Sequence, residues 1–428
     1  MKVQNPNPYP SRCRRTRCIS DLSEGERATL AGRIVGFRSG WLLSDETGEA
    51  QITLVDGSDS LYVGDIVEMD GVWRAARFEA AEVRMLARAL RAPKSLSPNV
   101  GENLKVRARS LSRIRSFFET GGFVEVETPM LVPCPGMEPH LTAFETAYGD
   151  RGQERRLFLH TSPEYGMKRL LGAGFERIFQ ICKAFRHEAA GAMHNPEFTI
   201  LEWYRAYADY EAIMADSEAL IYELAMEINE TPHVCYKGRT VDVTPPWERL
   251  SLGEAFARYA GIEIDPGGDP ERFVGSAREN GLASVTCDDG YESAFFKVFL
   301  DRVEGQLGRE KPTILTDYPA DMAALAKLKP GRPDLAERFE IYIAGVELAN
   351  GFTELNDPAE QRVRFETEAL ERRSNGSSVY PVDEAFLEAM EAGIPPAGGI
   401  AMGVDRLVML LTGAKTIGEV IAFPFCEQ

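Results

Sequence analysis

Residues able to bind a nucleotide are concentrated in one segment, Phe179–Tyr210, with the sequence FQICKAFRHEAAGAMHNPEFTILEWYRAYADY. Two apolar runs flank a short loop, Ala189–Met193, and this pattern predicts an antiparallel hairpin. Side chains two positions apart share one face of a strand. Arg186 and Glu188 are therefore expected to point the same way at the end of the first strand.

The return strand of this hairpin is expected to add Phe198, Glu202 and Tyr204 to the same face. That face would offer a carboxylate for an exocyclic amine, an aromatic ring for a base and a guanidinium for a phosphate. Arginine suits the phosphate because its planar fork donates two hydrogen bonds at once. The alternative is a charged sheet face in contact with solvent.

Two further segments carry weaker signals. GGIAMGVDRLVMLLTG (Gly398–Gly413) predicts a glycine-rich strand that runs into an apolar helix. Arg406 would lie near the start of this helix, and Gly403 would let a ligand approach the backbone. The small residues there could instead serve only close packing. The third segment, GGFVEVETP (Gly121–Pro129), reads as a helix-to-strand connection, which is not specific by itself.

The elements that must position these residues form a β-rich part and a mixed part. Residues 1–20 predict a disordered basic arm, and short strands broken by Gly and Asp turns over residues 21–92 predict a small all-β barrel. Residues 93–103 have the composition of a linker. An amphipathic helix is predicted from Leu104 to about Thr120, and strands then alternate with helices through residues 104–428, with helices near 206–230 and 358–374.

Composition narrows the class of protein. The 428 residues carry a formal charge of −18, and residues 1–94 are nearly neutral, so the acidic excess lies in the remainder. An acidic surface disfavours non-specific adhesion to nucleic acid. The seven cysteines are scattered and predict no zinc site. No long apolar run or secretory signal is visible, so the sequence predicts no membrane partner and a cytoplasmic location. The glycine-rich motifs GxGxxG and GxxxxGK[ST] do not occur, so the sequence does not support an NAD-dependent or P-loop enzyme.

The three segments resemble motifs 1, 2 and 3 of the class II aminoacyl-tRNA synthetases, in the order expected for that class. The strings HTSPEYGMKRLL, HNPEFT and ELANGFTELND resemble the lysyl-tRNA synthetase branch. The resemblance implies an α+β catalytic domain around an antiparallel sheet, preceded by an OB-like barrel. It also implies a homodimer, and a ligase that uses ATP and Mg2+ to make an aminoacyl-adenylate.

The resemblance also implies roles for individual residues. Arg186 and Arg406 would be catalytic, since they match the arginines that hold the α-phosphate and the γ-phosphate. Glu340 and Glu347 match carboxylates that hold Mg2+, and oxygen ligands suit this hard cation. The residues implied in ATP binding are Arg186, His187, Glu188, His194, Asn195, Phe198, Glu347, Leu348, Gly403 and Arg406.

The amino-acid pocket is implied by a second set of matches. Glu354 matches the carboxylate that binds the side-chain ammonium of lysine. An uncharged substrate would leave this carboxylate unpaired, at a cost of several kcal/mol. The residues implied in amino-acid binding are Ser162, Pro163, Glu164, Tyr204, Asn350, Glu354 and Ala401.

The motif matches leave the acceptor of the activated amino acid open. At three positions the residue type resembles that of a lysyl-tRNA synthetase relative, the enzyme that modifies a lysine of elongation factor P with (R)-β-lysine. These positions are Ser162, Ala401 and His140. The loop Ala189–Met193 has no cation to grip a tRNA. We therefore expect elongation factor P as the preferred acceptor.

Two alternatives to this acceptor stay open. One is a lysine–tRNA ligase, which the barrel favours because Phe37 or Trp41 could stack on tRNA bases. The other is a lysine-binding regulatory protein that has no turnover.

Overall fold

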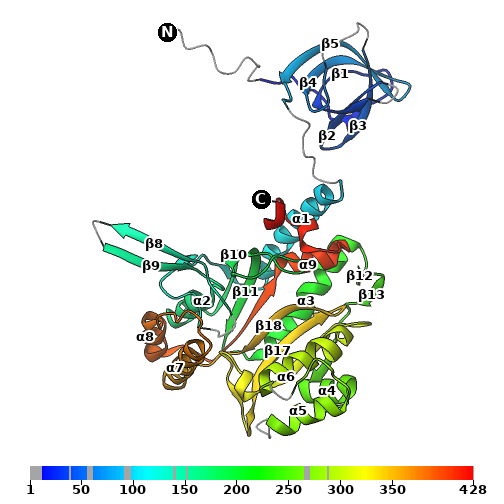
Figure 1. Ribbon diagram of the computed structural model, residues 1–428. Coiled ribbons are helices and arrows are strands. Elements are labelled where there is room, and N and C mark those ends of the chain that lie inside the picture. Colours follow the sequence, from blue (N-terminus) through cyan, green and yellow to red (C-terminus); the bar gives the residue numbers. More distant parts are fainter. Residues whose placement is uncertain are drawn as a thin grey trace. The chain divides into compact units, whose positions relative to one another are not determined.

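The computed structural model describes residues 12–37, 40–54, 61–90, 98–137, 141–150, 153–264, 270–286 and 289–427 (Figure 1). The chain forms two compact units, which divide between Leu96 and Ser97. This division falls inside the linker predicted over 93–103, of which residues 93–97 lie outside the described residues. The first long helix, α1 (Pro98–Thr120), begins before the predicted start at Leu104.

The smaller unit is a closed five-stranded barrel with strand order β1-β2-β3-β5-β4. Its interior holds apolar side chains such as Leu30, Ile34 and Phe78, all fully buried. Closure of the sheet leaves no long edge exposed, and the architecture confirms the predicted OB-like all-β unit. The strands are β1 (Arg27–Phe37), β2 (Trp41–Asp45), β3 (Gly48–Leu54), β4 (Ile66–Arg74) and β5 (Arg77–Ala87).

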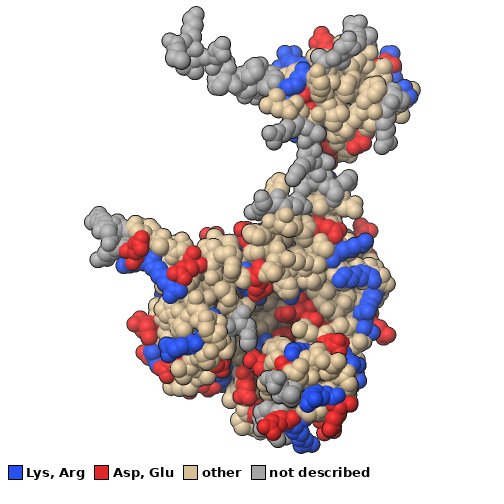
Figure 2. Space-filling view, viewed as in Figure 1, with Lys and Arg blue, Asp and Glu red and all other residues tan. Residues whose placement is uncertain are grey.

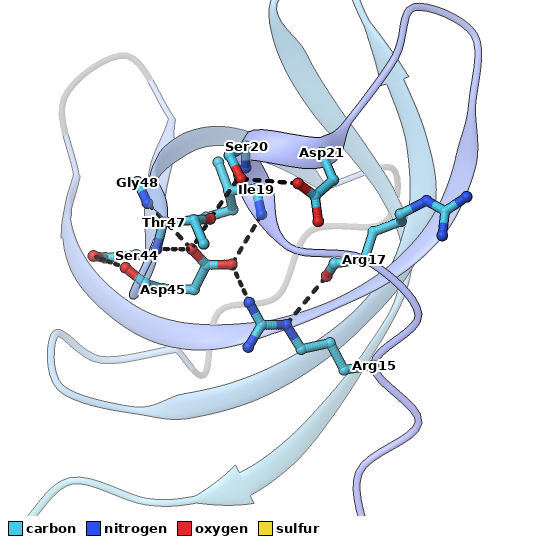
Figure 3. A network of polar contacts seen from close by, with 9 residues as sticks. All are labelled: Arg15, Arg17, Ile19, Ser20, Asp21, Ser44, Asp45, Thr47 and Gly48. Atoms are coloured by element: carbon cyan, nitrogen blue, oxygen red, sulfur yellow. Dashed lines mark hydrogen bonds and ion pairs between the residues drawn. The ribbon is translucent and has the colours of Figure 1, made fainter. Parts of the chain in front are cut away.

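The segment before β1 lies against this barrel, and Asp45 is one of the residues that hold it there (Figure 3). One oxygen of Asp45 accepts hydrogen bonds from the Ile19 amide at 2.9 Å and from Arg15 Nη2 at 2.5 Å. The Thr16 amide donates to the Thr29 carbonyl at 2.9 Å. The prediction of a disordered arm is therefore wrong for residues 12–20, because their polar groups find partners on the barrel. Residues 1–11 lie outside the described part.

The larger unit is built on a mostly antiparallel sheet with the order β14-β15-β17-β18-β19-β11-β10-β6, and β16 pairs with β17. Two pairs, β14 with β15 and β10 with β6, are parallel. The sheet confirms the predicted α+β class. Its strands are β6 (Val124–Glu125), β10 (Arg177–Phe185), β11 (Glu197–Ala206), β14 (Glu248–Ser251), β15 (Thr313–Pro319), β16 (Leu328–Lys329), β17 (Arg332–Ile343), β18 (Val346–Thr353) and β19 (Ala397–Gly403).

One face of this sheet packs against α1, α3 (Tyr210–Asn229) and α9 (Val404–Thr412). Phe118 of α1 stacks on Phe179 of β10 with ring centroids 4.9 Å apart, and Trp203 packs beside them. Phe179 and Trp203 are opposite each other across the β10–β11 pair. Large aromatic surfaces buried in this way fix α1 on the sheet.

Two groups of helices complete the unit (Figure 1). One group is α2 (Glu164–Gly172), α7 (Pro358–Ser374) and α8 (Glu384–Gly393); the other is α4 (Leu252–Ala260), α5 (Pro270–Glu279) and α6 (Tyr291–Val298). Small sheets are formed by β7 (Leu131–Val132), β8 (Glu145–Asp150) and β9 (Gln153–Leu159), and by β12 (His233–Tyr236) and β13 (Arg239–Asp242). None of the described helices has the length and apolarity that a bilayer crossing requires.

The contacts of Asp45 predict how the arm responds to mutation. Asp45→Ala removes the acceptor of several hydrogen bonds. A loss of about 1.5 kcal/mol in the free energy that holds the arm on the barrel would raise the fraction of molecules with a detached arm roughly tenfold. We expect faster tryptic cleavage after Arg14, Arg15 and Arg17, followed by mass spectrometry. Glu49→Ala, at an exposed position of β3, is the control. Equal cleavage rates in both variants would show that Asp45 does not hold the arm.

Candidate active site

A cavity of about 790 Å³ opens in the larger unit over β11, β18 and β19. Figure 2 shows acidic side chains gathered at a hollow on this face. Sixteen of the eighteen predicted site residues line the cavity. They are Ser162, Glu164, Arg186, Glu188, His194, Asn195, Phe198, Tyr204, Glu340, Glu347, Leu348, Asn350, Glu354, Ala401, Gly403 and Arg406.

The predicted hairpin exists, but its connection is longer than expected. β10 ends at Phe185 and β11 begins at Glu197, so Arg186 and Glu188 lie on the connection and not on a strand. The Arg186 amide still donates to the Pro196 carbonyl at 2.9 Å. The two-residue period of β11 holds, and it places Phe198, Glu202 and Tyr204 along the cavity.

One end of the cavity combines an arginine with an aromatic ring. The guanidinium carbon of Arg186 lies 5.1 Å from the centre of the Phe198 ring. Nε of Arg186 is buried and has no hydrogen-bond partner within the described residues. A buried donor without an acceptor is costly. An anionic ligand such as a phosphate would supply the missing acceptor.

Arg406 lies at the first turn of α9, where β19 ends. Its Nη1 donates to the Glu347 carbonyl at 2.8 Å, and its Nη2 lies 2.9 Å from Nε2 of His194. Because arginine can only donate, His194 Nε2 must accept and the ring must be neutral. Burial and the charge of Arg406 lower the pKa of His194, in agreement with this assignment.

Glu340 and Glu347 come together because β17 and β18 are neighbours. Glu340 accepts from Arg338 Nη2 at 2.9 Å and from the Tyr342 hydroxyl at 2.6 Å. Burial and the adjacent charge of Glu340 raise the pKa of Glu347. No group of three or more acidic, histidine or cysteine side chains in the described chain is placed to hold a metal alone. Two carboxylates that repel each other fit Mg2+ when phosphate oxygens complete its shell.

The other end of the cavity is a buried acidic cluster of Glu164, Glu202 and Glu354. Glu202 is 0% exposed and accepts hydrogen bonds from Ser162 Oγ at 2.5 Å and from the Tyr204 hydroxyl at 2.9 Å. Burial raises the pKa of Glu202 to about 8, and the charge of Glu164 adds to the rise. Burial also raises the pKa of Glu354 to about 8. Carboxylates in such a place favour a cationic ligand.

Gly399 makes room for this cluster. A Cβ at this position would overlap with Oε1 of Glu354 and with the ring of Tyr204. The glycine follows from the sheet register, because Gly399 of β19 is opposite Tyr204 of β11 and Phe352 of β18. A larger residue would force either the carboxylate or the ring out of place.

Two predicted residues lie outside the cavity wall. The His187 ring packs edge-on against Phe144, with centroids 5.1 Å apart, and its amide donates to the Thr142 carbonyl. Pro163 precedes α2 as its N-cap residue. Neither residue lines the cavity, so the nucleotide contact of His187 and the amino-acid contact of Pro163 stay predictions.

The sequence assigned no part in the amino-acid pocket to two residues near its acidic end. Glu202 was expected on the same face as Phe198 and Tyr204 from the two-residue period of β11, but only as part of the nucleotide-binding face. Lys168, which contacts Glu164 and Glu354 from α2, carried only the four-residue spacing from Glu164. That spacing is common on helix surfaces, so it did not mark a buried residue.

Comparison with known proteins agrees with this geometry. A family described as tRNA synthetases class II (D, K and N) matches residues 81–427. A lysine–tRNA ligase of Chloroflexus aurantiacus is 34% identical, over 100% of this chain and 96% of the relative. Those of Magnetococcus marinus and Moorella thermoacetica are 36% and 37% identical, over 98% and 94% of this chain and 93% and 89% of theirs.

The antiparallel sheet, the arginines at one end of the cavity and these matches define an ATP-dependent ligase with the aminoacyl-adenylate-forming fold. The chain belongs to the class II tRNA synthetase family.

The tight packing around Gly399 predicts a selective defect. Gly399→Ala would displace Glu354 or Tyr204, so amino-acid-dependent ATP–pyrophosphate exchange should show at least a tenfold rise in the amino-acid KM, equal to about 1.4 kcal/mol. The KM for ATP should change much less. Gly253→Ala, which has open space at its Cβ, is the control. An unchanged amino-acid KM would contradict the geometry.

Proposed function

We propose that the protein activates lysine with ATP and transfers it to tRNA. The observation that carries the amino-acid assignment is the acidic cluster, in which Glu202 and Glu354 are 0% and 1% exposed. Buried carboxylates need a cation, and the side-chain ammonium of lysine would supply one. A neutral side chain of similar length would leave negative charge uncompensated, because Lys168 is one cation against three carboxylates.

The first chemical step needs no protein nucleophile. A carboxylate oxygen of lysine would attack the α-phosphorus of ATP, and the bond between the α-phosphorus and its bridging oxygen would break to release pyrophosphate. Arg186 would neutralise charge that develops on the α-phosphate, and Arg406 would hold the distal phosphates. Phe198 would stack on the adenine. Glu340 and Glu347 would hold Mg2+, which when bound would offset the charge of the phosphates.

In the second step a ribose hydroxyl at the end of the tRNA would attack the lysyl carbonyl, and AMP would leave. Two observations support tRNA as the acceptor. The relatives named lysine–tRNA ligase match the chain along nearly its whole length, barrel included. On the barrel, Phe37 is 64% exposed and its ring lies 5.2 Å from Trp41, which suits stacking on unpaired bases.

A second candidate is transfer of lysine or (R)-β-lysine to a lysine of elongation factor P. It is favoured by the loop Ala189–Met193, which offers no cation to a polyanion. It is also favoured by Ser162, whose hydroxyl donates to Glu202 and so touches the amino-acid end of the cavity. The relatives support tRNA better than this acceptor. His140, which also suggested it, lies outside the described residues.

Transfer of label decides between the two acceptors. Radiolabelled lysine and (R)-β-lysine are each incubated with ATP, the protein, and either total tRNA or purified elongation factor P. We expect acid-precipitable, ribonuclease-sensitive label on tRNA with lysine. Label on elongation factor P with none on tRNA would replace the proposed acceptor by the second candidate. No lysine-dependent pyrophosphate exchange at all would overturn the activity itself and leave a binding protein without turnover.

A homodimer is a further part of this proposal. The segment after α1 exposes the apolar side chains of Val124, Met130 and Leu131. An apolar strip that solvent would otherwise cover is typical of a protein interface.

The double variant Val124→Asp with Leu131→Asp should therefore shift the chain from dimer to monomer in sedimentation velocity. Each buried, unpaired carboxylate would cost several kcal/mol at the interface. Leu370→Asp, at an exposed position of α7, is the control and should sediment as the wild type. A wild-type chain that is monomeric at micromolar concentration would rule out this assembly.

A further inference from the structure

Lys168 is a buried cation inside the acidic end of the cavity. Its side chain is 1% exposed, and its Nζ lies 2.6 Å from Glu164 Oε1. Nζ also forms an ion pair with Oε2 of Glu354 and lies 5.2 Å from the centre of the Phe352 ring. Burial alone would lower the pKa of Lys168, but Glu164 and Glu354 outweigh this and raise it. The ammonium is therefore charged.

Lys168 approaches the carboxylates from within the protein. Glu164, Glu202 and Glu354 all belong to the cavity wall, whereas Lys168 does not. It stands one helical turn after Glu164 on α2, with its amine directed to the carboxylates. Oε1 of Glu354 receives no hydrogen bond from any described residue. One oxygen of Glu354 is thus occupied by Lys168, and the other remains for a ligand.

The charges of the cluster can be counted. Three carboxylates and one ammonium leave two negative charges when all four groups are ionised. Lysine carries two ammonium groups, one on the α-carbon and one on the side chain. A bound lysine would therefore bring the buried end of the cavity to neutrality. A neutral amino acid brings one ammonium and would leave one negative charge uncompensated at low dielectric.

Other groups around the cluster do not change this count. The hydroxyls of Ser162 and Tyr204 donate to Glu202 without adding charge. Arg186 lies close enough to lower the pKa of Glu202 slightly against the effect of burial, but under the proposed function it is neutralised by the α-phosphate and the substrate carboxylate.

We propose that Lys168 is a positioning residue that sets the net charge of the amino-acid subsite to two negative charges, and so makes it selective for an amino acid with two ammonium groups. This inference rests on the proposed function for its substrate. It assigns no contact between Lys168 and the substrate. Its effect is exerted through Glu164 and Glu354, which it contacts and holds in place.

The pH dependence of binding follows from the same cluster. Below about pH 8, Glu202 and Glu354 tend to hold protons, and a protonated carboxyl group attracts an ammonium weakly. Ionisation of these groups as the pH rises should therefore lower the KM for lysine. Without the charge of Lys168, the pKa of Glu354 would rise further, so this fall in KM would move to higher pH.

The test compares Lys168→Met with Lys168→Arg and with Arg169→Met, which removes an exposed cation from the next position of α2. Lysine-dependent ATP–pyrophosphate exchange is measured between pH 6 and pH 9. For Lys168→Met we expect the KM for lysine at pH 7 to rise roughly tenfold or more, with the KM for ATP nearly unchanged and the fall in KM displaced to higher pH. Lys168→Arg should restore the pH profile, and Arg169→Met should match the wild type.

The outcomes separate this inference from the proposed function. Wild-type exchange combined with a wild-type pH profile in Lys168→Met would overturn the role of Lys168 alone. No exchange in the wild type would overturn the activity. If Lys168→Met does not fold, as shown by circular dichroism, Lys168→Gln is measured in its place. A profile displaced to higher pH in Lys168→Gln supports the charge count, and a wild-type profile contradicts it.

The wild-type chain gives an independent measurement. Calorimetric titration of lysine at pH 7, in two buffers of different ionisation enthalpy, should show that binding releases protons from the cluster, and the release should diminish at pH 9. Binding without proton release at pH 7 would contradict the proposed coupling.

Discussion

One buried ion pair ties α1 to two of the segments that carry the chemistry, Phe179–Tyr210 and Gly398–Gly413. Asp405, at the start of α9, accepts from Arg107 Nη1 of α1 at 2.5 Å and from the Thr199 amide of β11 at 2.9 Å. Arg107 also donates to the Thr199 hydroxyl at 2.7 Å. Asp405 is nearly buried, so loss of either partner would leave an unpaired charge in the interior. The neighbouring residues Phe198 and Arg406 are placed in the cavity by this junction.

The two ends of the cavity carry charge of opposite sign. Arg186 and Arg406 gather positive charge where the proposed function requires the phosphates of ATP, and Arg406 is held by a backbone carbonyl and a neutral histidine. At the other end, Glu164, Glu202 and Glu354 are close together and would repel each other without Lys168. Without a ligand, each end of the cavity carries charge that no partner compensates. A zwitterionic amino acid with a cationic side chain, presented with ATP, complements both.

The acceptor and the activated amino acid are recognised by groups of different exposure. The adenylate-forming end depends on buried groups, whose partners are limited by desolvation. An acceptor meets exposed groups, whose interactions are screened by solvent. The loop Ala189–Met193, which has no cation, therefore favours a protein acceptor, whereas the exposed ring of Phe37 favours tRNA. Similarity to relatives along nearly the whole chain also favours tRNA and outweighs the absence of cations in one loop.

The sequence by itself determined the class of fold and most of the cavity wall. The two-residue period of β11 and the glycine-rich segment at residues 398–413 are local patterns, because strand alternation and close backbone approach are local constraints. Only the tertiary structure decided what depends on distant pairs. Lys168 pairs with Glu354, Asp45 pairs with the arm, and His187 turns away from the cavity, because charges become partners only when folding brings remote segments together and removes water from between them.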